Sequence, residues 1–392
     1  MLENVLKLIL FFLIKIIPKK KNVLVFGDRG GKRFADNSRY LYFYLKEYHE
    51  EFRCIWITKS FKILSNIKEL NYEVYHANSL KGIYYCLIAK WHLFNFVEDD
   101  INKNITTFSN SILLWHGVLP KNLNEIRHKK NFVNNFIYKR LKKYFVYPNQ
   151  KMSQNLIQRF PKYKYKLLIS NLPRNLHLEK NKKILLMKNE KEIIKKIEYS
   201  KKKVYGYFPT WRNDGIEIFR DVKNFDKLIE LNESLKKTNS IILLKKHMNS
   251  EKKDGDRRYN HDIEKMISKL RGLENFMFAD YYTDLNSILY KCDYLISDYS
   301  GVVFDFLYLK KPIILYVPDY DEFLSKNGFN LNIVDSEISK VVKTFDDLKD
   351  LIEKNNLDIK DLNILKNVKK MREEVFPDNN HEIKNILDKI SF

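Results

Sequence analysis

Short apolar runs, each ending in a turn rich in Gly, Pro, His or Asp, recur along the chain and constrain its fold more than any other feature. The first series opens at residues 23–26 and continues with a glycine-rich turn at 27–31 and a segment of helical periodicity at 37–48. Strands separated by helices predict a parallel sheet with helices on both faces. Further runs of strand length occupy residues 54–58, 92–96, 112–115, 145–147 and 167–169.

A second series of the same kind follows a lysine-rich stretch at residues 181–203, whose apolar residues have helical spacing and predict a connecting helix. We therefore expect an α/β protein with two doubly wound, Rossmann-like domains that face each other across a cleft, at residues 22–180 and 204–375. A C-terminal helix is expected at 376–392. Ligands of such sheets bind at the carboxyl ends of the strands. The strand-length runs of the second series occupy residues 204–208, 241–245, 276–278, 294–296 and 313–316.

The first 21 residues have the pattern of a helix at a membrane interface. Residues 5–17 are almost all apolar, Pro18 ends the run, and a lysine cluster follows at 19–21. The run is shorter than the roughly 20 residues that a bilayer-spanning helix needs. It also lacks the leading positive charge and the small-residue cleavage site of a signal peptide. We expect residues 1–21 to lie in the interface, with the lysines near anionic headgroups. An ordinary helix packed on the protein is the alternative.

The charge balance predicts a polyanionic partner. Among 392 residues, Lys and Arg total 71 against 49 acidic residues, a formal net charge of +22. Such an excess suits nucleic acid, an anionic membrane surface or a phosphate-rich substrate. Part of this excess of positive charge has an alternative explanation, which is a Lys-, Asn- and Ile-rich composition that reflects an AT-rich genome. Three scattered cysteines form neither a disulfide framework nor a metal-binding pair, which is typical of a reduced, cytosolic chain.

Residues 293–305 carry the strongest motif of the second half. A buried strand ends in the polar loop Ser297-Asp298-Tyr-Ser300-Gly301, and a helix is predicted to begin directly after it. Unsatisfied N–H groups at a helix start suit a diphosphate, and Gly301 lets a phosphate approach the backbone. Asp305, one turn into the helix, is placed to contact a ribose or polyol hydroxyl. The alternative is that Ser300 only caps the helix and Asp298 only orders a turn.

Two further strand ends in this half carry cations. Lys245 begins the run Lys-Lys-His247, which offers charge-assisted donors to a diphosphate leaving group. Thr210 and Arg212 follow a strand stopped by Pro209 and are expected to present a hydroxyl and a guanidinium to the cleft, suited to phosphate. The alternative for His247 is a purely structural role. The alternative for Thr210 and Arg212 is that they belong to a rigid turn in which Trp211 packs in the core.

In the first half, the sequence Trp115-His116-Gly117 follows a strand directly. Gly117 permits a sharp turn that exposes His116 at the sheet edge, where it is a candidate general base for an attacking hydroxyl. Basic residues interleaved with apolar ones follow at 121–143, Lys143 among them. This stretch predicts a patch for a polyphosphate acceptor or a membrane, or else a solvated helix face. The loop at 27–32 has neither dinucleotide-binding nor Walker spacing.

Together and in this order, these residues resemble the CDP-glycerol glycerophosphotransferase family of teichoic acid and capsule synthesis. The resemblance extends from about residue 23 to about residue 330. In the first half it rests on Gly31-Lys32, Asp36-Asn37-Ser38-Arg39-Tyr40, Trp115-His116-Gly117 with Lys121, and Pro173-Arg174-Asn175. In the second half it rests on Pro209-Thr210-Trp211-Arg212, His247, Ser297-Asp298-Tyr299-Ser300, Phe304-Asp305 and Lys311-Pro312 with Tyr316.

The resemblance implies a GT-B-like architecture, with the acceptor on residues 22–180 and a CDP-activated donor on residues 204–375. An acceptor hydroxyl would attack the donor's β-phosphate in line and release CMP, with His116 as base and His247 at the diphosphate. No metal and no cofactor is expected, since protein cations would stabilise the leaving group. The implied donor-binding residues are Thr210, Arg212, Lys245, His247, Ser297, Asp298, Ser300, Gly301 and Asp305. The implied acceptor-side residues are Gly31, Lys32, Asn37, Arg39, Lys121 and Arg174.

The resemblance further implies a peripheral enzyme at the cytoplasmic face of the bacterial plasma membrane, acting on a phosphate-rich or lipid-linked glycan. Val118, Met248 and Gly301 depart from the family pattern and leave ribitol phosphate or another CDP-activated unit open. Two rival functions remain: a GT-B glycosyltransferase that uses a nucleotide-sugar, and a nucleic-acid-binding protein. The sequence contains no recognised DNA- or RNA-binding motif, so nucleic acid is not the expected partner.

Overall fold

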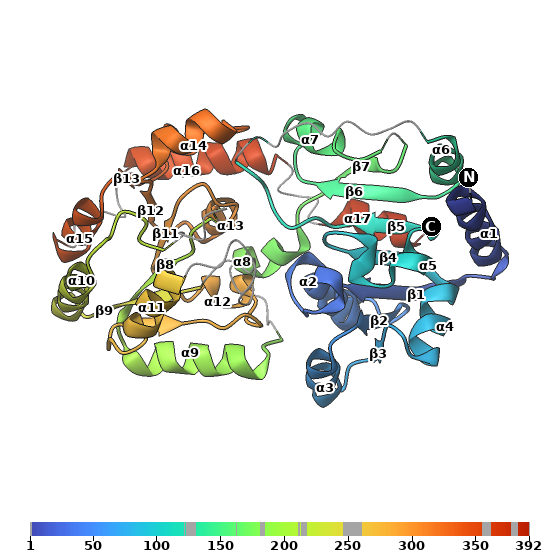
Figure 1. The fold of residues 1–392 in the computed structure, drawn as a ribbon, viewed down its shortest axis with the longest axis horizontal. Helices are drawn as coiled ribbons and strands as arrows, with labels where there is room; N and C mark the ends of the chain where they lie inside the picture. The colour runs from blue at the N-terminus through green and yellow to red at the C-terminus, as the bar shows by residue number, and fades with distance from the viewer. Residues whose placement is uncertain are drawn as a thin grey trace. The chain divides into compact units, whose positions relative to one another are not determined.

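The computed structural model describes residues 2–120, 122, 131–161, 163–180, 185–210, 212, 218–245, 261–354, 362–377 and 383–391. The chain forms two compact units, each built on its own parallel sheet (Figure 1). Unit 1 comprises the described residues of 1–118, 123–185 and 375–392, and unit 2 those of 119–122 and 186–374. The expected pair of doubly wound α/β sheets is thereby confirmed.

Unit 1 contains a seven-stranded sheet in the order β3-β2-β1-β4-β5-β6-β7, and every neighbouring pair is parallel. Leu24, Val25 and Phe26 of the interior strand β1 are fully buried, as expected for a strand covered on both faces. The strands are β1 (Lys20–Gly27), β2 (Arg53–Thr58), β3 (Val74–His76), β4 (Ala89–Phe94), β5 (Ser111–Leu113), β6 (Lys143–Tyr147) and β7 (Lys166–Ile169).

Helices connect these strands, and several begin at a residue whose side chain caps them. Ser60, Ser79, Asn131 and Asn149 each accept a hydrogen bond from the first turn of the helix that follows, which satisfies an otherwise unpaired N–H. The helices of this unit are α2 (Asp36–Tyr48), α3 (Phe61–Glu69), α4 (Leu80–Ile88), α5 (Lys103–Thr106), α6 (Phe132–Lys139), α7 (Gln150–Ile157) and α8 (Leu176–Lys180), with 3-10 turns η1 (Arg29–Gly31), η2 (Glu98–Asp100) and η3 (Pro173–Asn175).

Unit 2 contains a six-stranded parallel sheet in the order β10-β9-β8-β11-β12-β13. Its strands are β8 (Lys203–Tyr207), β9 (Ser240–Leu244), β10 (Phe276–Phe278), β11 (Tyr294–Ser297), β12 (Ile313–Tyr316) and β13 (Lys340–Val342). Its helices are α9 (Lys188–Ser200), α10 (Asp226–Lys237), α11 (His261–Leu270), α12 (Leu285–Leu289), α13 (Val302–Phe306), α14 (Tyr320–Asn327), α15 (Phe345–Lys354) and α16 (Leu362–Val375), and the 3-10 turn η5 (Leu307–Leu309) follows α13.

The strand orders define one switch point in each sheet. In unit 1, β2 and β3 lie on one side of β1, whereas β4 and the strands after it lie on the other side. In unit 2, the strand order reverses in the same way between β8 and β11. Loops that leave neighbouring strands at such a point diverge and leave a crevice, where ligands of this fold class bind. The polar residues that follow β1, β4, β8 and β11 are therefore the first candidates for a site.

The two ends of the chain both belong to unit 1. Helix α1 (Leu2–Ile16) contacts α6, with Phe11 against Phe136, and Phe11 and Ile14 are its buried residues. Helix α17 (Lys384–Ser391) contacts β7, where Asn385 Nδ2 donates to the Ile169 carbonyl at 2.7 Å. Across the residues that the structure describes, no helix combines the length and the apolarity needed to cross a bilayer.

The structure corrects several local predictions. Strands β3 and β13 were not predicted, because each is short, mixes polar with apolar residues and is at most partly buried along most of its length. Strand β5 ends at Leu113 instead of residue 115, and the helix predicted after the Asp298 loop is a five-residue α13 followed by a 3-10 turn. Lys143, placed in the basic patch, is buried in β6, where its ammonium group donates to the Thr106 carbonyl at 3.1 Å.

Candidate active site

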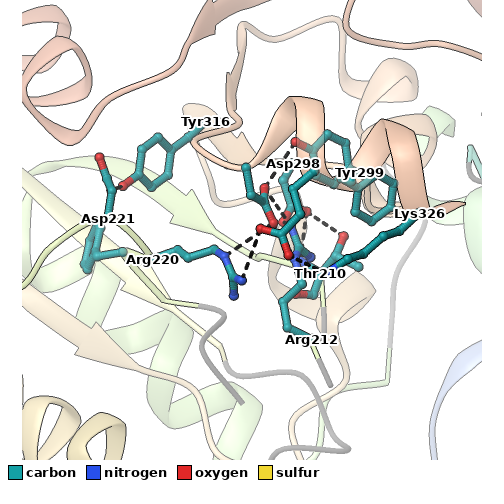
Figure 2. A network of polar contacts seen from close by, with 12 residues as sticks. Thr210, Arg212, Arg220, Asp221, Asp298, Tyr299, Tyr316 and Lys326 are labelled. Atoms are coloured by element: carbon teal, nitrogen blue, oxygen red, sulfur yellow. Dashed lines mark hydrogen bonds and ion pairs between the residues drawn. The ribbon is translucent and has the colours of Figure 1, made fainter. Parts of the chain in front are cut away.

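Polar side chains from three loops meet at the carboxyl edge of the second sheet. Thr210 follows β8, Asp298 follows β11 and Asp319 follows β12. The Asp298 carboxylate accepts hydrogen bonds from the Thr210 backbone N–H, at 2.8 Å, and from the Thr210 hydroxyl. The two loops on either side of the switch point are thus tied together directly (Figure 2).

Arg212 ties the third loop to the other two. Its Nε and Nη2 donate to the Asp319 carboxylate at 2.9 and 3.3 Å, Nη2 also donates to Asp298 at 2.9 Å, and Nη1 donates to the Thr210 carbonyl at 2.9 Å. Four of its five N–H donors are thereby used. The guanidinium also lies 5.2 Å from the ring centroid of Tyr299, which is stacked on Phe323.

The electrostatics agree with a neutralised cluster. Burial alone would raise the pKa of Asp319, but hydrogen bonds and charge from Arg212 outweigh it and hold that pKa below its ordinary value. Burial disfavours the charge of Arg212, but the two carboxylates outweigh it and raise the pKa of the guanidinium. Arg220 adds a further contact to Asp319 at 3.5 Å. The expectation that Thr210 and Arg212 present a hydroxyl and a guanidinium to a phosphate stays a prediction; in this structure Arg212 joins the three loops through its hydrogen bonds.

Three other predicted donor-side residues, Ser297, Lys245 and Asp305, are buried. The Ser297 hydroxyl is fully buried and donates to the Phe208 carbonyl at 2.8 Å, so it braces β11 against the end of β8. Lys245 directly follows β9 and donates from Nζ to the Asp280 carbonyl at 2.6 Å. Asp305 is buried on α13. In this conformation all three contact protein, and His247 lies outside the described residues.

Within the motif at 293–305, Asp293 is exposed and Ser300 and Gly301 are partly exposed. Gly301, and not Ser300 as predicted, occupies the capping position of α13, while Ser300 Oγ accepts from the Val302 N–H at 3.4 Å. Because Asp298 is fixed by Thr210 and Arg212, the backbone of this loop starts from a fixed point. The loop therefore presents Ser300 and Gly301 on a rigid support.

In unit 1, the loop after β5 carries His116, and two buried side chains fix its backbone. Asn37 Nδ2, from the start of α2, donates to the Trp115 carbonyl at 2.8 Å. Arg174 Nη1, from η3, donates to the His116 carbonyl at 2.9 Å and to Asp36 Oδ1 at 3.0 Å. Asn37 and Arg174 were predicted on the acceptor side. In the structure, their side chains donate hydrogen bonds to the backbone carbonyls of this loop.

Glycine is required at position 117 for two reasons. Its φ of +120° is one that other residues rarely adopt, and a Cβ atom there would lie 2.2 Å from Arg174 Nη2. Trp115 has a φ of 62° and Asp36 a φ of 59°, both in the left-handed region. Each such non-glycine residue costs about 1 kcal/mol or more, and strain of this kind concentrates at functional sites.

The His116 ring packs against two aromatic rings. Its centroid lies 4.2 Å from that of Phe96, nearly parallel at 16°, and 4.1 Å from that of Trp115. The guanidinium carbon of Arg29 lies 3.3 Å from the Phe96 centroid. Arg29 follows β1 and Phe96 follows β4, so this stack stands at the switch point of the first sheet.

A buried acidic pair supports that stack. Asp100 accepts backbone hydrogen bonds from Gly30 at 2.8 Å and from Phe96 at 2.7 Å. Asn95 Nδ2 donates to Asp28 Oδ1 at 2.9 Å. Burial raises the pKa of Asp28 to about 8, with the charge of Asp100 adding to the effect, and burial raises the pKa of Asp100 to about 6. The pair ties the loops after β1 and β4 into one rigid unit.

The remaining predicted acceptor-side residues are Gly31, Lys32, Arg39 and Lys121. The Gly31 carbonyl accepts from the Lys59 N–H at 2.6 Å, and Lys32 beside it is exposed. Arg39 is fully buried, donates to the Leu185 carbonyl and lies 5.4 Å from the Phe34 centroid, so it packs in the protein interior. Lys121 lies outside the described residues. Within the described ranges, no group of three or more His, Cys, Asp and Glu side chains is arranged to hold a metal ion.

Residues 9–384 match the protein-family model described as CDP-glycerol:poly(glycerophosphate) glycerophosphotransferase. The chain belongs to this family. It is 29% identical over 385 residues to the teichoic acid poly(glycerol phosphate) polymerase of Bacillus spizizenii, with 91% of this chain and 89% of that protein covered. It is 27% identical to the protein of that name from Bacillus subtilis strain 168, covering 88% of this chain but only 45% of that longer protein.

The fold of this chain is similar to that of a solved structure. The structure of the wall teichoic acid polymerase TagF superposes with a TM-score of 0.69 over 99% of this chain and 92% of that one, at 21% sequence identity. At that identity the likeness shows the fold alone, which is GT-B-like as the sequence resemblance implied. The family recognised from the motifs is confirmed by the match of residues 9–384 to the family model.

Sequence reasoning missed several residues of the two clusters. Asp319 follows β12 at the same edge as Asp298, so the strand-end rule that found Asp298 also applied to it. Arg29 and Phe96 follow the two strands of the other switch point. Their stacking with His116 depends on which strands are neighbours, and the order of strands in a sheet has no local sequence signal.

We predict that Arg212→Ala destabilises the protein by about 3–5 kcal/mol, because it leaves the buried Asp298 and Asp319 carboxylates without their cation. Arg220→Ala is the matched control. Arg220 contacts Asp319 only at 3.5 Å and is more exposed, so its loss costs about 1 kcal/mol or less. Urea unfolding measures both free energies. Equal losses in the two variants would refute the role of Arg212 as the clip between the three loops.

Proposed function

We propose that this chain transfers glycerol phosphate from CDP-glycerol to a hydroxyl of a teichoic-acid-type poly(glycerol phosphate) acceptor. The observation that carries the proposal is a rigidly held histidine at the carboxyl edge of the first sheet in a chain of this family. His116 stands on a strained loop in which the Trp115 carbonyl accepts a hydrogen bond from Asn37 and the His116 carbonyl accepts one from Arg174. A general base needs this kind of fixed placement.

The proposed reaction is an in-line displacement at phosphorus. The acceptor oxygen forms a bond to the β-phosphorus of CDP-glycerol, the bond from that phosphorus to the bridging oxygen breaks, and CMP leaves. The acceptor's proton passes to the neutral imidazole of His116. Phe96 and Trp115 pack on that ring and limit the directions in which its nitrogens can point. Positioning of this kind supplies much of the rate enhancement in phosphoryl transfer.

The donor is assigned to the loops that follow β8, β9 and β11 of unit 2. Ser300 and Gly301 are partly exposed there, and the hydrogen bond from Arg212 to Asp298 fixes the loop that carries them. Lys245 supplies positive charge at the end of β9, and His247 is assigned to the diphosphate by family resemblance. The buried Thr210, Ser297, Asp298 and Asp305 position these loops in our proposal and do not contact the donor directly.

We further propose that α1 attaches the enzyme peripherally to an anionic membrane. Ile9, Phe12 and Leu13 are 49%, 52% and 53% exposed, whereas ordinary surface helices bury residues of this kind. Lys20 and Lys21 are exposed directly after it. An apolar helix face beside lysines suits the boundary between headgroups and acyl chains. The apolar residues of α1 that are at least two-fifths exposed are Leu2, Val5, Leu6, Ile9, Leu10, Phe12, Leu13 and Ile16.

For the catalytic proposal, we predict that His116→Ala lowers CMP release from CDP-glycerol by about 100-fold or more while the Kd of CDP-glycerol changes less than about threefold. Removing a general base costs about 10²–10⁴ in rate, and in our assignment the donor binds to unit 2. Stopped reactions give the rate, and calorimetry gives the affinity. A variant that keeps the wild-type rate, or that loses donor binding to the same extent as its rate, would contradict the assignment.

For the membrane proposal, we predict that the double variant Ile9→Glu/Leu13→Glu loses at least about tenfold in affinity for phosphatidylglycerol vesicles. Each change replaces an inserted apolar side chain, worth about 1.5–3 kcal/mol, with a charge. Phe61→Glu is the matched control, because Phe61 is 75% exposed but lies on α3. Vesicle cosedimentation measures the affinity. Unchanged binding of the double variant would show that α1 does not insert.

A further inference from the structure

Arg29 stands at the switch point of the first sheet with its hydrogen-bond donors unused. It follows β1 on the 3-10 turn η1, and its side chain is partly exposed. Within the part of the chain that the structure describes, its guanidinium packs on the Phe96 ring and forms no hydrogen bond or ion pair. A guanidinium carries five N–H donors, and half-buried groups of this kind are normally paired. The donors of Arg29 are therefore open to a ligand.

Arg29 and His116 lie on opposite faces of the Phe96 ring. The guanidinium carbon is 3.3 Å from the Phe96 ring centre, and the His116 ring centre is 4.2 Å from it, with the two ring planes at 16°. Two flat groups this close to one ring centre would overlap if they shared a face. At 3.3 Å the guanidinium also has to lie flat, because an edge-on approach would push its nitrogens into the ring. Its N–H donors therefore point outward, past the rim of the stack.

The carboxyl groups that act electrostatically on Arg29 have other partners or carry no charge. Burial raises the pKa of Asp28 to about 8, with Asp100 adding to the effect, so Asp28 keeps its proton at neutral pH. Asp100 accepts hydrogen bonds from backbone N–H groups, and Asp36 pairs with Arg174 at 3.0 Å. Burial lowers the pKa of Arg29 to about 10, which leaves the guanidinium charged at neutral pH. An anion bound there would replace the hydration that burial removes.

The family to which the chain belongs identifies phosphate as the anion. Its description, CDP-glycerol:poly(glycerophosphate) glycerophosphotransferase, names a donor and an acceptor that both carry phosphate. A planar guanidinium binds two oxygens of one phosphate at once. The donor is assigned above to loops of unit 2, whereas Arg29 and His116 both stand on loops of unit 1. The phosphate at Arg29 is therefore expected to belong to the acceptor.

A glycerol phosphate chain has a suitable spacing to contact both side chains at once. Its terminal hydroxyl and the nearest phosphodiester are attached to the same three-carbon unit, a few covalent bonds apart. The thickness of the Phe96 ring separates Arg29 from His116. A hydroxyl at the imidazole thus leaves the adjacent phosphodiester within reach of the guanidinium. A sugar hydroxyl without a neighbouring phosphate would leave the charge of Arg29 unpaired.

We propose that Arg29 binds the phosphodiester next to the attacked hydroxyl and so selects acceptors that already end in glycerol phosphate. The proposal rests on the transfer function proposed above and adds a specificity-determining residue to it. Arg29 binds the acceptor and takes no part in proton transfer, which stays with His116. The protein then extends an existing glycerol phosphate chain more readily than it starts one on a neutral sugar.

The first test measures acceptor binding without turnover. In calorimetry of the full-length protein with a glycerol phosphate trimer and no donor, Arg29→Met should weaken the Kd by about tenfold or more, because a bidentate charged contact is lost. Methionine keeps an unbranched apolar chain against Phe96.

Lys46→Met is the matched control for this test. Lys46 is an exposed lysine in the last turn of α2, so the variant removes the same charge from another place. It should change the Kd less than about twofold, because exposed charges are largely screened. Equal weakening in the two variants, or a wild-type protein that does not bind the trimer, would overturn the proposal.

Arg29→Lys separates a role in binding from a role in folding. Lysine keeps the positive charge but cannot offer two parallel donors to one phosphate. Its Kd for the trimer should lie between those of the wild type and Arg29→Met, and urea unfolding of both variants should have the wild-type midpoint. Equal loss of affinity in both variants together with a lowered midpoint would show that Arg29 is only structural, which would overturn the proposal.

The second test identifies the substrate whose phosphate Arg29 contacts. In transfer from CDP-glycerol to the trimer, Arg29→Met should raise the KM of the trimer about tenfold or more and change the KM of CDP-glycerol less than about twofold. A raised KM of CDP-glycerol with an unchanged KM of the trimer would assign the contact to the donor and overturn the proposal. A wild-type protein that binds the trimer but releases no CMP would contradict the transfer function, while the calorimetry would still decide the role of Arg29.

Discussion

Parallel pairing is the constraint on which the rest of this structure depends. Every strand pair in both sheets is parallel, so all strand carboxyl ends of a unit meet at one edge. The apolar strands supply the burial that stabilises each sheet, and their loops are left to carry polar chemistry. In both units the loops beside the switch point hold the polar clusters. The same constraint therefore fixes the fold and the location of the candidate site.

Buried polar contacts convert these loops into rigid supports. In unit 2, Arg212 joins Asp298 and Asp319 and holds the Ser300-bearing loop against the end of β8. In unit 1, Asn37 and Arg174 hold the two carbonyls of a strained turn that carries His116. Such networks are stable only when nearly all of their members are paired. They stabilise a conformation with left-handed residues that the isolated loop would not adopt.

The sequence predicted the two sheets, the family and the loops that carry the clusters, because apolar periodicity and strand-end chemistry are local signals. It did not predict that Arg212 binds the Asp298 and Asp319 carboxylates, because the sequence around an arginine at a strand end does not show whether its partner is a phosphate or a carboxylate. Arg39 was assigned to the acceptor side, but its burial follows from α2 packing. The stack of Arg29, Phe96 and His116 requires β1, β4 and β5 to be neighbours, which only tertiary structure reveals.

Product analysis across a donor panel tests whether this protein transfers a polyol phosphate from a CDP-activated donor. The purified protein would be incubated with a glycerol-phosphate acceptor and, separately, with CDP-glycerol, CDP-ribitol and nucleotide-sugars, and both products would be identified by mass spectrometry. With CDP-glycerol, we predict CMP release and acceptor growth by one or more glycerol phosphate units. Growth by a sugar unit from a nucleotide-sugar, with no CMP from any CDP-polyol, would contradict it.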